Sequence, residues 1–126
     1  MRILVIEDDE FLRAEICEYL KRRRHDVLGC ATLAEGRSVA RQHAATDGPE
    51  AILCDVNLAD GNGVEFCLET AAVLPNRRWI LMSGGHSDSQ VARLDGIDAD
   101  IAIVDKPVRI KELENLLTGG AHQIVS

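Results

Sequence analysis

The sequence predicts a doubly wound α/β fold: one domain built on a five-stranded parallel sheet. Its 126 residues are the length of a single domain that can bury a core. Five short apolar runs are each bounded by turn residues, which is typical of buried strands in a parallel sheet. Segments with helical spacing or helix-capping residues separate these runs, so strands and helices alternate along the chain.

The five predicted strands are similar in length and end at polar residues. The third ends at Asp55 and is followed by a loop rich in Asn, Asp and Gly, so Asp55 is expected at the edge of the sheet where such folds place their chemistry. The predicted strands are residues 3–6, 26–30, 51–55, 78–82 and 101–104.

The predicted helices lie between these strands. Asp9 is placed to cap the first helix, in which Leu12, Ile16 and Leu20 recur every four residues. Thr32 is placed to cap the second, which we expect to reach about residue 45. The others are expected at residues 63–74 (with Val64, Cys67, Leu68 and Ala71 on one face and Pro75 as the stop), around residues 89–95, and from Ile110 through Leu113 and Leu117 to Gly119 and Gly120.

Right-handed crossovers between such strands give the flavodoxin-like (βα)5 arrangement with strand order 2-1-3-4-5. We expect the folded domain to cover residues 1–118 and residues 119–126 to form a loose C-terminal tail.

Composition excludes several classes of function. The net charge of −7 argues against direct binding of nucleic acid or of an anionic membrane. No apolar run approaches the length of a membrane span and no signal-peptide pattern precedes the first strand, so we expect a cytoplasmic protein. The four cysteines are far apart in apolar settings and are expected to be reduced, buried thiols. The basic run at residues 21–24 is expected to be a solvated helix end.

Polar residues follow four of the five predicted strands. Glu7 and Asp8 follow the first, Asp55 ends the third, Ser83 follows the fourth, and Lys106 comes just after the fifth. Each alone has a structural explanation as a cap, a turn or a loop boundary. Because the carboxyl ends of parallel strands meet at one edge of the sheet, we expect these side chains to converge.

This set of residues suits phosphoryl transfer. Three crowded carboxylates repel one another, and a divalent cation such as Mg²⁺, which prefers carboxylate and phosphate oxygens, relieves that repulsion. Lys106 and Ser83 can hold phosphoryl oxygens. Asp55 is then placed as a nucleophile that forms an acyl phosphate.

With these residues the chain resembles the receiver domains of two-component response regulators, most closely the single receivers of the chemotaxis-regulator kind. The resemblance covers nearly the whole sequence. Its motifs are the segment Ile-Leu-Val-Ile-Glu-Asp-Asp at residues 3–9, Asp55 with Leu58 and Asp60-Gly61, Met-Ser-Gly at residues 82–84, and Lys106-Pro107.

The resemblance implies a role for each site residue. Asp55 receives a phosphoryl group from a phosphohistidine of a sensor histidine kinase or phosphotransfer protein. Asp8, Asp55 and the main-chain carbonyl of Asn57 bind Mg²⁺ (or Mn²⁺) directly, and Glu7 binds it through water. Ser83 is the switch hydroxyl, Lys106 binds the phosphoryl group, and the Lys106–Pro107 peptide bond is cis.

The same resemblance implies a signalling phosphoprotein and not an enzyme, with only Mg²⁺-dependent self-phosphorylation from a phosphodonor and self-dephosphorylation. When Asp55 is phosphorylated, the surface formed by the fourth helix, fifth strand and fifth helix would change. That surface would bind a downstream protein, an output domain absent from these residues, or a second copy in a homodimer. Two residues depart from the family pattern: Ala59 replaces a frequent proline, and Ile103 replaces the aromatic switch residue.

Two alternatives remain open from the sequence. A phosphatase with an aspartyl nucleophile would need a second acid two residues after Asp55, where this chain has Asn57. A degenerate receiver that binds partners without phosphorylation is compatible with Ile103, although all five key positions are filled.

Overall fold

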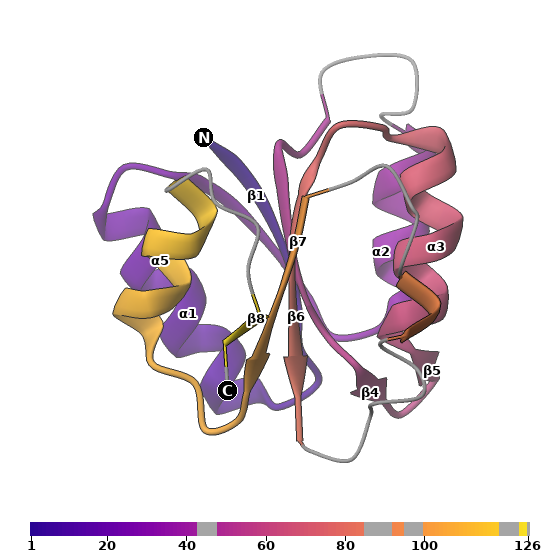
Figure 1. Ribbon diagram of the computed structural model, residues 1–126. Helices are drawn as coiled ribbons and strands as arrows, with labels where there is room; N and C mark the ends of the chain where they lie inside the picture. The colour runs from indigo at the N-terminus through magenta and orange to yellow at the C-terminus, as the bar shows by residue number, and fades with distance from the viewer. Residues whose placement is uncertain (43–47, 85–91, 95–99, 119–123, 126) are drawn as a thin grey trace.

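A parallel sheet lies between two layers of helices in the computed structural model, which describes residues 1–42, 48–84, 92–94, 100–118 and 124–125 (Figure 1). The five predicted strands are present in the predicted order, 2-1-3-4-5, as β2-β1-β3-β6-β7, and all pair in parallel. Their bounds are Arg2–Ile6 (β1), Asp26–Cys30 (β2), Ala51–Asp55 (β3), Arg78–Ser83 (β6) and Asp100–Asp105 (β7).

Two short features were not predicted. The loop after β3 forms a hairpin of β4 (Asn57–Leu58) and β5 (Gly61–Asn62). Near the C-terminus, β8 (Ile124–Val125) pairs in parallel with β7. The prediction of a loose tail is therefore wrong for these two residues. Their pairing satisfies backbone groups that β7 would otherwise leave open at the sheet edge.

The helices divide between the two faces of the sheet as a doubly wound fold requires. One face carries α1 (Glu10–Arg22) and α5 (Ile110–Thr118), and the other carries α2 (Leu33–Gln42), α3 (Gly63–Val73) and the short 3₁₀ turn Ala92–Leu94 (Figure 1). Several predictions lie outside the described residues: the end of the second helix near residue 45, most of the helix at 89–95, the glycines at 119–120, and the rest of the tail. The domain boundary at residue 118 stays a prediction.

The capping predictions are confirmed. The carboxylate of Asp9 accepts hydrogen bonds from the amides of Phe11 (3.0 Å) and Leu12 (3.1 Å). The hydroxyl of Thr32 accepts one from the amide of Glu35 at 3.1 Å. These acceptors satisfy amides that the first turn of a helix leaves without partners.

The buried face of α3 is wider than its predicted stripe. Val64 and Cys67 are buried as expected, but so are Phe66 and Thr70, whereas Leu68 and Ala71 are only partly buried. The reason is that α3 packs against α2 as well as against the sheet: the guanidinium of Arg37 on α2 lies 6.0 Å from the centre of the Phe66 ring.

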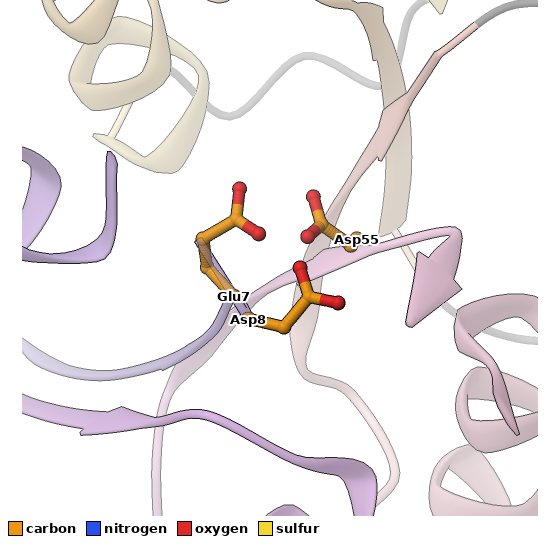
Figure 2. A group of neighbouring side chains, drawn as sticks. All are labelled: Glu7, Asp8 and Asp55. Atoms are coloured by element: carbon orange, nitrogen blue, oxygen red, sulfur yellow. The ribbon is translucent and has the colours of Figure 1, made fainter. Parts of the chain in front are cut away.

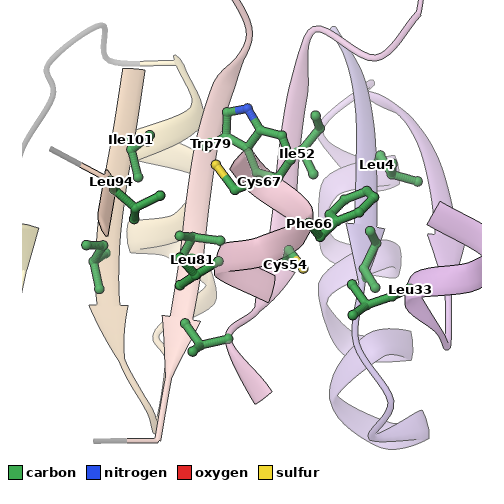
Figure 3. Close-up of a cluster of buried hydrophobic side chains, with 14 of the residues drawn as sticks. Leu4, Leu33, Ile52, Cys54, Phe66, Cys67, Trp79, Leu81, Leu94 and Ile101 are labelled. Carbon is green, nitrogen blue, oxygen red and sulfur yellow. The ribbon is translucent and has the colours of Figure 1, made fainter. Parts of the chain in front are cut away.

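Two apolar cores fill the space between the sheet and its helices. On the α2–α3 face, the rings of Phe66 and Trp79 meet edge to face with their centres 5.7 Å apart (Figure 3). Ile103 is buried in the same cluster. All four cysteines are free thiols; Cys30, Cys54 and Cys67 are buried as predicted, whereas Cys17 is only partly buried. Among the described residues, no helix has the length and apolar character needed to cross a membrane.

The connection from β3 to α3 depends on a glycine. The amide of Gly63 donates a hydrogen bond of 2.6 Å to the carbonyl of Val56. A Cβ atom at Gly63 would lie only 1.9 Å from the backbone oxygen of Asp55. The start of α3 therefore presses directly on the end of the strand that carries Asp55, and only glycine permits this approach.

We predict that Gly63→Ala lowers the free energy of unfolding by about 2–3 kcal/mol, because the new methyl group must displace backbone and not a flexible side chain. Urea denaturation measures the change. Gly84→Ala is the matched control, since a Cβ there meets nothing within 4 Å. Equal stability of the two variants would contradict the prediction.

Candidate functional site

The carboxyl ends of the central strands bring the predicted side chains together. Glu7 and Asp8 follow β1, and Asp55 ends the neighbouring strand β3. One carboxylate oxygen from each of these three residues lies within 4.8 Å of the others. Figure 2 shows the three carboxylates gathered in one space although they come from two different strand ends. The convergence expected from the strand order is therefore confirmed for the acids.

Lys106 joins this group from the end of β7. Its ammonium nitrogen Nζ lies 2.8 Å from Oδ1 of Asp55 and 3.0 Å from Oε1 of Glu7. The other oxygen of Glu7 accepts a hydrogen bond from the amide of Asp9 at 3.2 Å. The Lys106–Pro107 peptide bond is cis, as predicted. One cation thus bridges two carboxylates that are almost fully buried, with exposed fractions of 0% for Glu7 and 1% for Asp55.

The remaining predicted residues lie nearby, and their roles stay predictions. Ser83 is buried at the end of β6, directly after Met82, which is the register partner of Asp55. Its carbonyl accepts a hydrogen bond of 2.7 Å from the amide of Lys106. Asn57 is exposed at the start of the hairpin, two residues after Asp55.

Burial and mutual repulsion shift the protonation of the site. Burial, together with the adjacent Glu7 carboxylate, raises the pKa of Asp55 well above its ordinary value. Burial also acts on Glu7, but its hydrogen bonds, including that from Lys106, outweigh it and lower the pKa of Glu7. For Lys106, the two carboxylates outweigh burial and raise the pKa of the ammonium group. Among the described residues, Lys106 is the cation that pairs with carboxylates of this group of three acids, so the carboxylates carry more charge than it offsets.

The donor set fits a hard divalent cation. Oδ2 of Asp55 is buried and has no hydrogen-bond donor among the residues that the structure describes. Such an orphaned acceptor is rare in folded proteins unless a ligand or ion completes it. The exposed carboxylate of Asp8 belongs to the same group of three. Carboxylate oxygens at an open, negatively charged edge are the ligands that Mg²⁺ or Mn²⁺ prefers.

Two contacts that shape the acidic group were not predicted. Arg13 on α1 donates from Nη1 to the main-chain carbonyl of Glu7 at 2.9 Å, and the amide of Ala59 donates to Oδ2 of Asp8 at 3.3 Å. Neither residue belongs to a sequence pattern that marks such a contact, because each contact depends on how α1 and the β4–β5 hairpin pack at the sheet edge.

We predict that Asp55→Asn raises the stability of the metal-free protein at neutral pH by about 1–2 kcal/mol. A carboxyl with a raised pKa resists ionisation in the folded state, so it destabilises the fold increasingly as the pH rises above the ordinary carboxyl pKa toward its own. Neutral asparagine removes that penalty. Urea unfolding in the presence of a chelator, at acidic and at neutral pH, measures the difference in the free energy of unfolding between Asp55→Asn and the wild type. A gain that does not grow with pH would contradict the stated cause.

Comparison of the sequence with known proteins gives two matches. The family model of the response regulator receiver domain matches residues 3–118. The DNA-binding transcriptional activator DevR/DosR of Mycobacterium tuberculosis (strain ATCC 25618 / H37Rv) is 32% identical over 99 residues, which are 77% of this chain and 43% of that protein. The chain therefore spans less than half the length of this curated relative.

Solved structures share the fold. A response regulator receiver domain from Clostridium thermocellum superposes with a TM-score of 0.82 at 19% identity, covering 94% of this chain and 91% of that one. A response regulator from Burkholderia pseudomallei, solved with a phosphorylated aspartic acid, a calcium ion and citrate, superposes with a TM-score of 0.76 at 21% identity, covering 93% and 66%. At such identities the likeness shows the fold alone.

Proposed function

The chain belongs to the response regulator receiver domains, signalling domains of two-component systems, and from this premise we propose that Asp55 is its phosphoacceptor. The donor is a phosphohistidine of a sensor histidine kinase or of a phosphotransfer protein. The protein acts as a switch whose phosphorylated form has a different binding surface, and not as a classical enzyme. A cytoplasmic location is part of the same proposal.

The observation that carries the proposal is the difference between the contacts of the two carboxylate oxygens of Asp55. Lys106 holds Oδ1, and Oδ2 has no hydrogen-bond donor among the described residues. A carboxylate oxygen of Asp55 attacks the phosphorus atom of the donor, so that an O–P bond forms while the N–P bond of phosphohistidine breaks. The electron pair of the broken bond stays on the imidazole nitrogen. The acyl phosphate carries more negative charge than the carboxylate it replaces, so the Lys106 ammonium and a bound divalent cation would have to offset that charge.

The side chains around Asp55 suit the incoming group. The ammonium of Lys106 is close enough to move from the carboxylates to a phosphoryl oxygen, where its charge is most useful. We assign the Ser83 hydroxyl as donor to a second phosphoryl oxygen. Because the amide of Lys106 bonds to the carbonyl of Ser83, the two groups are linked through the backbone and can shift together.

Asp8, Asp55, the carbonyl of Asn57 and, through water, Glu7 are proposed to hold Mg²⁺ (or Mn²⁺). When bound, the cation supplies positive charge that offsets both the carboxylates and the phosphoryl oxygens. The phosphorylated aspartic acid and calcium ion of the Burkholderia pseudomallei regulator support this assignment by likeness of fold.

The proposed output surface includes β7 and α5. Lys106 follows β7 directly, and α5 is the next element along the chain. Movement of Lys106 toward a phosphoryl group would therefore shift the end of β7 and the start of α5. The partners are a downstream protein, a second copy of the chain, or an output domain of a longer regulator, which agrees with the coverage of DevR/DosR. Ile103, only 8% exposed in the α2–α3 core, has no ring to rotate. We propose that the signal passes through the backbone and α5 instead.

We predict that acetyl phosphate adds one phosphoryl group to the protein, and that the reaction requires both Mg²⁺ and Asp55. Intact-mass spectrometry of the wild type, with and without Mg²⁺, and of Asp55→Asn measures this. Asp105→Asn is the matched control, because Asp105 is an exposed acid at the same sheet edge. The control should be phosphorylated like the wild type.

Phosphorylation of Asp55→Asn would place the acceptor elsewhere. No phosphorylation of the wild type, from acetyl phosphate or from a phosphohistidine donor, would leave the alternative that Ile103 favours, an interaction module that works without phosphorylation.

A further inference from the structure

The β4–β5 hairpin is joined to α2 by one side chain. Oδ1 of Asp60 accepts a hydrogen bond from the amide of Leu33 at 3.1 Å, and Oδ2 accepts one from the amide of Ala34 at 3.1 Å. Bonding to these amides, that of Leu33 first, lowers the pKa of the Asp60 carboxyl, so it is ionised at neutral pH. An anion from a distant loop thus sits on the first turn of the helix.

The helix shares its first amides between two acceptors. Thr32, the residue before α2, takes the amide of Glu35 with its hydroxyl and that of Gly36 with its carbonyl. Asp60 takes the two amides that Thr32 does not reach. The bond from the Gly36 amide to the Thr32 carbonyl is the first regular bond of the helix, so three amides are capped, two by Asp60 and one by the Thr32 hydroxyl. Losing Asp60 therefore removes two of these three caps and at the same time releases the hairpin from α2.

The hairpin also contacts the acidic group. The amide of Ala59 donates to Oδ2 of Asp8, which ties the turn of the hairpin to a proposed metal ligand. Gly61, with a φ of +152°, lies so close to α2 that a Cβ atom would be 2.9 Å from Cδ1 of Leu33. The side chain of Asn62 accepts hydrogen bonds from the amides of Val64 (2.7 Å) and Glu65 (3.2 Å) at the start of α3.

The hairpin needs such anchors. Each of its strands has only two residues, and a pair that short has little stability of its own. Ala59 lies at its turn, where a proline would have restricted the backbone. The register pairs Asn57 with Asn62 and Leu58 with Gly61, so the anchored strand β5 fixes the position of Asn57 across from it.

We propose that Asp60 is a positioning residue for the metal site: by clamping the hairpin to the first turn of α2, it holds the Asn57 carbonyl and the Ala59 amide in place beside Asp8 and Asp55. This inference rests on the proposed function, which supplies the metal. It has a reciprocal consequence. If Asp60 transmits order from α2 to the metal loop, then bound metal must increase the order of the first turn of α2 by the same coupling.

The test compares three variants. Asp60→Ala removes the clamp. Thr32→Ala removes the other cap of the same helix without touching the hairpin. Glu10→Gln removes one exposed acid near the site that lies outside the acidic group. The readouts are the Kd for Mg²⁺ from calorimetry and the exchange of the Leu33 to Gly36 amides with and without Mg²⁺.

We expect Asp60→Ala to raise the Kd for Mg²⁺ about tenfold, the size of effect that supporting residues of metal sites commonly have. The wild type and both control variants should keep a similar Kd, and in them Mg²⁺ should slow amide exchange in the first turn of α2. In Asp60→Ala this effect of Mg²⁺ on exchange should be lost. If Asp60→Ala does not fold, Asp60→Asn, which keeps one acceptor oxygen, should give an intermediate Kd.

Failure of the inference and failure of the proposed function look different. If the wild type does not bind Mg²⁺, or Asp55→Asn binds it equally well, the proposed site is wrong. If the wild type binds Mg²⁺ through Asp55 but Asp60→Ala matches it in Kd and in metal-dependent exchange, the clamp is disproved. An equal loss of affinity in Glu10→Gln would also disprove it, because charge alone would then explain the effect.

Discussion

The contact between the Lys106 ammonium and the carboxylates of Asp55 and Glu7 is the interaction around which this protein is organised. Placing charges in a nearly dry setting is unfavourable unless each charge is compensated, and one lysine cannot compensate three neighbouring acids. The uncompensated negative charge acts mainly on Asp55. Its Oδ2 has no hydrogen-bond donor among the described residues, and its pKa is raised. A site built in this way favours the binding of added positive charge.

The sheet makes this arrangement possible. β1 and β3 are hydrogen-bonded neighbours, so Glu7 and Asp55 must lie side by side, and the pairing of β6 with β7 brings Ser83 level with Asp105, the residue before Lys106. The rigid cores above and below the sheet keep the strand ends in register. Gly63 then lets α3 start directly against the backbone of Asp55, so the stability of the fold and the geometry of the site depend on the same few atoms.

Two departures from the receiver pattern are linked to specific features of the structure. At Ile103 a buried aliphatic side chain stands where the family usually has an aromatic ring, and a hydrogen bond from the Lys106 amide to the Ser83 carbonyl joins the ends of β7 and β6 at the site. At Ala59 the turn lacks a proline, and the same turn is held by Asp60 and by the contact of the Ala59 amide with Asp8.

The sequence by itself determined the five strands, their order, the capping roles of Asp9 and Thr32, and the meeting of the acids with Lys106. These follow from local signals: apolar runs, capping residues, and the rule that parallel strands end at one edge. Only the tertiary structure decided the rest. Phe66 and Thr70 are buried because α3 faces α2 as well as the sheet, β8 pairs because β7 is an edge strand, and Asp60 reaches the amides of a helix that begins 27 residues before it. Each of these depends on groups far apart in the chain, which no local pattern encodes.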